Sequence, residues 1–174
     1  MEADELIERI GAVFPLEPLP EMSLRQAWLA DQTMDREISE EEWMEAAKAD
    51  ERRSWPEFSD EELISREEAL AHLEESAFVY YLPAFLSFTV RHCSTGLSDP
   101  AGLLVGSTIF SVTHLSPYSL GRYKRLDACQ QAVVVAFLEF VALHAGPHQR
   151  ATAKEGLSRY WKTDEATKPL IVVP

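Results

Sequence analysis

Five histidines and two cysteines are the residues best suited to hold a metal or to attack a substrate. His144 and His148 have the i, i+4 spacing of a metal-binding helix face, but the Gly-Pro pair between them interrupts such a helix. The adjacent pair His92 and Cys93 has no second Cys/His pair at zinc-finger spacing. The sequence therefore predicts no metal site and no cofactor.

Nucleophilic catalysis has one candidate, the thiol of Cys93 with His92 or His114 as its base. Neighbouring residues cannot readily place a base against a thiol, and no glycine pattern for an oxyanion hole surrounds Cys93. The serines lack a GxSxG motif, and Gly102 and Gly106 are not followed by the GK[ST] of a phosphate-binding loop. These patterns argue against a catalytic nucleophile.

Two runs of consecutive carboxylates, Glu40–Glu42 and Asp60–Glu62, are the remaining candidates for chemistry. Consecutive side chains point away from one another on a helix, so these groups cannot flank one bond as a general acid and base would. Ser39 with Glu42, and Ser59 with Glu62, have the spacing of a capping box. Both runs are therefore predicted to begin helices, and the protein is predicted not to be an enzyme.

The acidic residues are concentrated at the front of the chain. Residues 1–75 hold 23 Asp/Glu and 7 Lys/Arg, whereas residues 76–174 hold 6 and 9, and the formal net charge of the whole chain is −13. An acidic surface repels phosphate backbones and anionic lipids, which disfavours nucleic acids and membranes as partners. It steers a basic protein toward itself. The alternative is that the charge only keeps the protein soluble.

We predict a docking surface for a basic protein in this acidic part. Trp28, Trp43 and Trp55 lie there among few apolar neighbours, and a tryptophan surrounded by carboxylates is well suited to anchor a partner. The same tryptophans would equally serve to attach a thin helical layer to the core. The predicted docking residues are Glu40, Glu41, Glu42, Trp43, Glu45, Trp55, Asp60, Glu61 and Glu62.

The elements that would carry this surface are helices. Apolar residues recur at helical spacing from Leu6 to Phe14, and the prolines that follow end that helix. Phe78–Val90 and Ala132–Leu143 are apolar on nearly all sides, which predicts buried core helices, and both are too short to cross a bilayer. The aromatic residues of the first stretch, Tyr80 included, are expected in the core rather than in a ligand pocket.

Residues 94–121 are rich in Ser, Gly, Pro and Thr and predict a long central connection, with at most a short helix or strand around Leu103 to Val112. Leu170 to Val173 is the only other strand candidate. Cys93 and Cys129 form no CxxC pair and are interpreted as buried free thiols, which fits a reducing cytoplasm. The acidic start, MEADELIERI, lacks the basic region of a signal peptide.

Two stretches, YYLPAFL at 80–86 and QQAVVVAFLEF at 130–140, resemble the signatures of an uncharacterised bacterial family of small acidic helical proteins. Trp55, Leu63 and Leu70 fit the spaced tryptophan and leucines of that family. The resemblance extends from Trp55 to Trp161 and leaves the first fifty residues largely unmatched. It implies a fold and no chemistry. Small acidic proteins of this sort are often encoded beside secreted toxins as immunity proteins.

The sequence thus predicts an all-α, single-domain helical bundle over residues 1–174, with an acidic helical region in 1–75, core helices in 76–174 and little or no β structure. The predicted function is a non-enzymatic immunity or antitoxin protein. It would neutralise a basic secreted toxin, such as a nuclease, by occluding its active site. The alternative is a regulatory adaptor or secretion chaperone without a toxin partner.

Overall fold

The computed structural model describes residues 1–50 and 53–163, and within them every regular element is a helix. The prediction of an all-α single domain is confirmed. The candidate strand Leu170–Val173 lies outside the described residues. The helices are α1 (Ala3–Val13), α2 (Leu24–Gln32), α3 (Glu40–Ala49), α4 (Asp60–Ile64), α5 (Ala69–His72), α6 (Glu75–His92), α7 (Pro100–Thr113), α8 (Pro117–Tyr123), α9 (Ala128–His144) and α10 (Pro147–Gly156), with a 3₁₀ turn at Trp55–Glu57 and a π turn at Leu157–Trp161.

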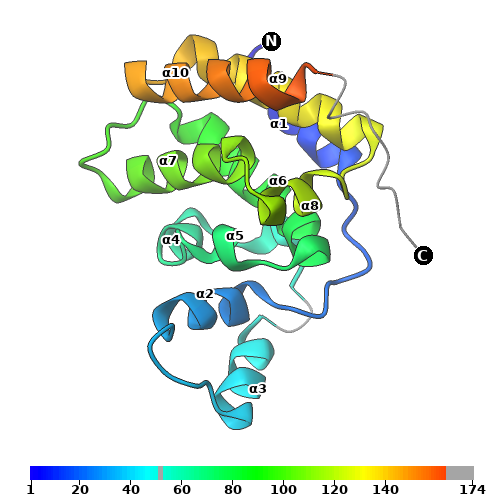
Figure 1. The fold of residues 1–174 in the computed structure, drawn as a ribbon, viewed down its shortest axis with the longest axis vertical. Helices are drawn as coiled ribbons and strands as arrows, with labels where there is room; N and C mark the ends of the chain where they lie inside the picture. The colour runs from blue at the N-terminus through cyan, green and yellow to red at the C-terminus, as the bar shows by residue number, and fades with distance from the viewer. Residues whose placement is uncertain (51–52, 164–174) are drawn as a thin grey trace.

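Helix α6 is the centre of the molecule, as its apolar sequence predicts. Its side chains from Tyr80 to Val90 are all buried, and α1, α7, α8 and α9 pack around it. The helix continues through Pro83 without a restart. In Figure 1, α9 and α10 cover this core on one side, and α4 and α5 lie on the other.

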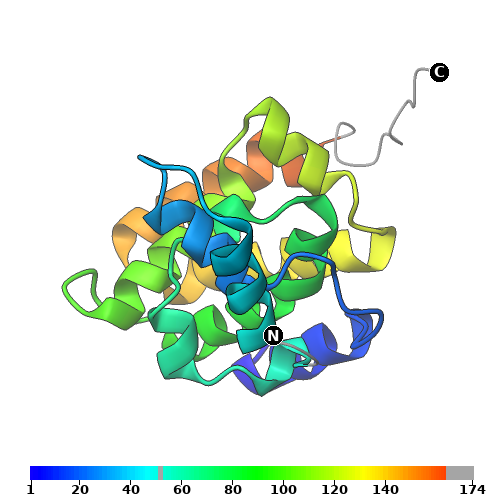
Figure 2. The ribbon, with the colours of Figure 1, turned by 90° about the horizontal axis from the view of Figure 1, so that it is seen from below.

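The acidic region does not form one layer. Leu6 and Ile10 of α1 are fully buried against α6 and α9, so α1 belongs to the core. Helix α2 packs on α5, and α3 packs on α2, which places these two helices at the far end of the molecule (Figure 1). Seen from that end, α2 and α3 lie in front of the core helices (Figure 2).

Residues 94–121 are mostly helical, so the prediction of a long central loop is wrong. Asp99 caps α7 by accepting a bond from the Ala101 N–H at 2.8 Å, and Pro100 supplies the first helical position. Gly102 sits against the backbone of Gly96, where a Cβ would lie 2.0 Å from the Gly96 oxygen. The small residues that suggested a loop therefore serve caps and close packing.

The capping boxes are confirmed at Ser39 with Glu42 and at Ser59 with Glu62.

No single helix in residues 1–50 and 53–163 is long and apolar enough to cross a bilayer. Among the described helices, α8 and α9 taken together are the one pair that reaches that length and composition, and the pair is bent by 116°.

Candidate docking groove

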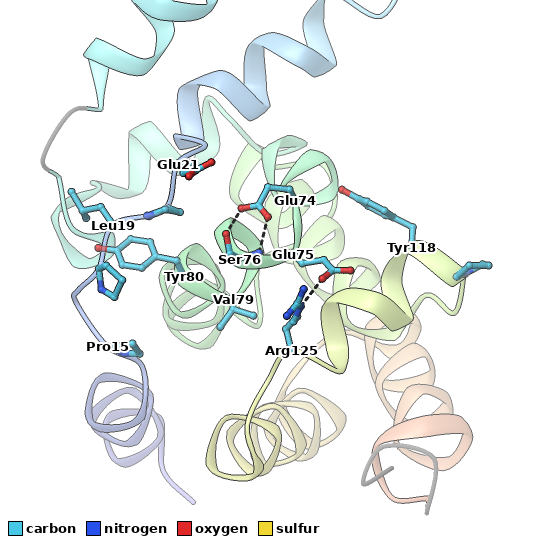
Figure 3. Close-up of a pocket in the computed structure, with 13 residues that line it drawn as sticks. Pro15, Leu19, Glu21, Glu74, Glu75, Ser76, Val79, Tyr80, Tyr118 and Arg125 are labelled. Atoms are coloured by element: carbon cyan, nitrogen blue, oxygen red, sulfur yellow. Dashed lines mark hydrogen bonds and ion pairs between the residues drawn. The ribbon is translucent and has the colours of Figure 1, made fainter. Parts of the chain in front are cut away.

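A groove of about 780 Å³ opens between the linker after α1, the start of α6 and the segment from α8 to α9 (Figure 3). The linker forms one wall, α8 and Arg125 form the other, and the first turns of α6 form the floor. Its volume falls in the range of sites that enclose small ligands. It is lined by Pro15, Pro18, Leu19, Pro20, Glu21, Glu74, Glu75, Ser76, Val79, Tyr80, Pro117, Tyr118 and Arg125.

Two aromatic side chains hold the linker wall in place. The prolines end α1 and restrict the linker, because each has a fixed φ and no backbone N–H. The indole N–H of Trp55 donates to the Pro15 carbonyl at 3.2 Å, and the hydroxyl of Tyr80 donates to the Leu16 carbonyl at 2.9 Å. The wall is thus tied to both the 3₁₀ turn and α6.

The floor is the capped start of α6. The Glu74 carboxylate accepts bonds from the backbone N–H groups of Ser76 at 2.9 Å and Ala77 at 2.7 Å, and from the Ser76 hydroxyl. Burial raises the pKa of Glu74, but these hydrogen bonds lower it by more, so the net shift is downward. Glu74 therefore carries its charge at neutral pH inside the groove.

The opposite wall is held in place by hydrogen bonds from Tyr118 and from the buried Arg122 to the segment before α6. The Tyr118 hydroxyl donates to the Leu73 carbonyl at 2.6 Å. Arg122 donates to the Leu70 carbonyl at 2.9 Å, and its guanidinium lies 4.4 Å from the ring centroid of Tyr118. At the rim, Arg125 Nε donates to Glu75 at 2.5 Å, which neutralises that carboxylate.

The groove has more negative than positive charge. Glu75 and Arg125 form an ion pair, Glu74 has no cation within ion-pair distance, and the exposed Glu21 makes no hydrogen bond or ion pair with the described residues. A smaller hollow of about 310 Å³ shares Glu21, Glu74 and Ser76 and extends to the half-buried Trp43 of α3. The combined surface is aromatic, apolar and acidic.

Several predicted docking carboxylates are already engaged inside the molecule. Glu42 pairs with Arg36 at 2.7 Å and caps α3, and these bonds lower its pKa to about 2. Glu62 pairs with Arg53 at 2.6 Å, which likewise lowers its pKa to about 2. Both carboxylates stabilise local structure, and a partner would have to displace an arginine to reach them.

Asp60 and Trp55 are also committed. Asp60 accepts bonds from Arg91 and, at 2.7 Å, from His92, which joins α4 to the end of α6. Trp55 is only 7% exposed and packs in the core, which leaves little of its surface for a partner to contact. Its indole N–H anchors the linker instead. Trp55 thus follows the alternative reading, in which tryptophans attach the acidic region to the core.

The remaining predicted residues stay accessible but are not gathered in one place. Glu40, Glu41 and Glu61 are exposed without a partner among the described residues, and Glu45 pairs with Lys48 at 2.9 Å. The two carboxylate runs begin different helices: α3 packs on α2, whereas α4 packs on α7. None of the predicted residues lines the groove itself, and Trp43 alone lines the hollow that adjoins it.

The catalytic candidates are not arranged for chemistry. Burial raises the pKa of Cys93 to about 11, the opposite of what a nucleophilic thiolate requires. The ring of His92 is held by Asp60, and His114 stacks on Phe110 with 4.6 Å between ring centroids. In the part of the chain that the structure describes, no three His, Cys, Asp or Glu residues converge on a potential metal position.

Sequence reasoning missed most of the groove. Tyr80 was expected in the core, and it is largely buried, but part of it lines the groove. Tyr118 lies in the segment that was interpreted as a connection. The one local signal was the run of prolines at 15, 18 and 20, which mark a constrained linker beside Glu21.

Comparison with known proteins gives a family and no function. No curated protein and no solved structure matches the chain. A family described as a family of unknown function, DUF6714, matches residues 2–165. This match includes the first fifty residues, which the resemblance in the sequence had left largely unassigned. The chain therefore belongs to the DUF6714 family of unknown function.

Proposed function

We propose that this chain is a non-enzymatic protein-binding protein whose partner is basic. The observation that carries the proposal is the groove, where Glu21, Glu74 and Glu75 face a single cation, Arg125. Apolar and aromatic walls supply contact area, and the unpaired carboxylates select a positively charged partner.

The specific form of this proposal is an immunity or antitoxin protein acting in the cytoplasm. The net charge of −13 favours rapid encounter with a basic toxin. A nuclease is a suitable target class, because it uses Lys and Arg side chains to hold phosphate. Carboxylates of this chain would form ion pairs with those side chains and so keep the nucleic acid from binding. Neutralisation would then result from occlusion of the active site.

One observation favours a second candidate, the regulatory adaptor or secretion chaperone. The acidic aromatic surface is concave, with a volume of about 780 Å³, and a concave site suits an exposed chain segment better than the recessed active site of a folded enzyme. The two candidates differ in the state of the partner that they bind.

The test is to co-express the chain with the protein encoded by the adjacent reading frame and to measure growth and complex formation. An immunity protein restores growth and binds the folded partner, with an affinity that falls as salt rises. An adaptor binds the urea-unfolded partner or its terminal segment in preference to the folded form. A chain that binds neither form of a basic neighbour refutes the proposal.

A further inference from the structure

We infer that the groove binds an arginine side chain carried on an extended segment of the basic partner. This inference rests on the proposed function and adds the chemistry of the occupant. It follows from three features of the groove: the direction of its hydrogen bonds, its uncompensated charge and the shape of its walls.

Apart from the Arg125 guanidinium, which is paired with Glu75, the polar side chains that line the groove present acceptors. A tyrosine hydroxyl has one proton, and those of Tyr80 and Tyr118 are donated to the Leu16 and Leu73 carbonyls. Neither phenol therefore has a proton left to donate to an occupant. The Ser76 hydroxyl donates to Glu74 and is likewise committed. An occupant rich in donors is required, and a carboxylate or phosphate would face acceptors.

The groove lining has a net negative charge, with three glutamates and one arginine. Arg125 is engaged by Glu75 at the rim, which leaves the charges of Glu74 and Glu21 without an ion-pair partner. A carboxylate offers about four lone-pair positions, and Glu74 uses three of them for its own helix. Glu21 uses none. One further cation fits this arrangement.

The walls favour arginine over lysine. The guanidinium is planar, has five donors and stacks on aromatic faces, whereas an ammonium is a compact and strongly hydrated charge. Tyr118, which is 50% exposed, offers its ring on one side of the groove (Figure 3), whereas Tyr80 on the linker side is only 5% exposed. Val79 on the floor is available to the aliphatic stem. The lining has no strand edge to pair with, so an occupant in polyproline II conformation, whose backbone is satisfied by water, suits it.

The probe is a short fluorescein-labelled peptide of alternating arginine and proline, with matched peptides in which lysine or neutral citrulline replaces arginine. Binding is measured by fluorescence anisotropy at low salt. We expect the arginine peptide to bind most tightly, the lysine peptide less tightly and the citrulline peptide least. Wild-type protein that fails to bind the arginine peptide, or binds citrulline equally well, overturns the inference.

Charge-matched variants locate the site. Glu21→Gln removes an unpartnered groove carboxylate, and Glu40→Gln removes an unpartnered carboxylate outside the groove, so both change the net charge equally. We expect Glu21→Gln to weaken arginine-peptide binding about three- to tenfold, the effect of a lost charge-assisted hydrogen bond near the surface. Glu40→Gln should change it by less than about twofold. Equal losses would mean non-specific attraction and overturn the inference.

A third variant separates this inference from the proposed function. Val79→Lys places a competing cation on the groove floor, and Val79→Leu is its apolar control. If Val79→Lys abolishes binding of the peptide and of the basic partner protein, both the arginine site and the proposed function are supported. If partner binding persists unchanged, the groove is not the interface, and only the proposed function survives. If wild-type protein binds the peptide with the expected specificity but no basic protein, the proposed function fails alone.

Discussion

Gly102 of α7 lies directly against the backbone of the turn that precedes this helix. A Cβ there would lie 2.0 Å from the Gly96 carbonyl oxygen and 3.2 Å from the Leu97 nitrogen. At Gly106, one turn later in the same helix, a Cβ would meet only the Leu97 side chain, at an ordinary 3.5 Å. Alanine at these two positions therefore separates steric cost from helix propensity.

The two substitutions are expected to have opposite signs. Alanine favours a helix over glycine by about 1 kcal/mol, so Gly106→Ala should raise the free energy of unfolding by up to that amount. The same gain applies at Gly102 but is outweighed. Overpacking costs about 1–3 kcal/mol, and the upper end applies because the obstacle is backbone rather than a flexible side chain. Gly102→Ala should lose about 2 kcal/mol net.

Urea unfolding followed by far-UV circular dichroism measures both variants against the wild type. A loss of about 2 kcal/mol in a domain of this size also lowers Tm by roughly 4–8 °C. Gly102→Ala with wild-type stability would show that the turn at 96–99 does not lie against α7 as described. A destabilised Gly106→Ala would show that the second position is not open. Either result refutes the reasoning.

Three further predictions concern titration, thiol reactivity and a buried arginine. Arg53 lowers the pKa of Glu62 from 4.5 to about 2. The ionised Glu62 therefore adds to the free energy of unfolding above pH 4.5, and this contribution is lost as pH falls toward about 2. Acid unfolding of Glu62→Gln should therefore show a shallower pH dependence in that window. Cys93 is buried as predicted, but Cys129 is exposed, so the prediction of burial is wrong for Cys129. Iodoacetamide should therefore label Cys129 well before Cys93, as followed by mass spectrometry, and equal rates would contradict the described burial. Arg122→Met should lower the free energy of unfolding by about 1–3 kcal/mol, because the Leu70 carbonyl loses its donor, and urea unfolding tests this.

The helices that could be predicted are those whose signals are local. Ser39 and Ser59 begin capping boxes that depend only on residues three positions apart, and both form. The apolar stretch from Phe78 is buried because no face of that helix is polar enough to meet water. Helix α7 was missed because its glycines and serines also fit a loop. The close approach of Gly102 to the Gly96 backbone, which is visible only in the structure, explains why α7 needs a glycine at that position.

The groove could not be predicted, because three segments far apart in the sequence form it. The linker near Glu21, the start of α6 and the region of Tyr118 meet only through tertiary packing. The sequence also does not show which carboxylates are free to bind a partner and which are already paired within the molecule. The commitment of Asp60 depends on Arg91 and His92, which are about thirty residues away and reach it only once α4 packs beside the end of α6.

The position of a carboxylate relative to a helix start determines whether it is free to bind a cation. Glu42, at the third position of α3, is used by its capping box. Glu40 and Glu41 project from the first turn, where the positive end of the helix dipole already stabilises their charge. A cation bound there would gain less, because it approaches the positive end of that dipole. Glu21 precedes the Ser23 cap of α2 and takes no part in a cap, so among the groove carboxylates it offers an arginine the largest gain, whereas Glu74 is itself the N-cap of α6. A carboxylate in the linker therefore binds a basic partner more strongly than a carboxylate at the start of α3, although the helix start has more carboxylates.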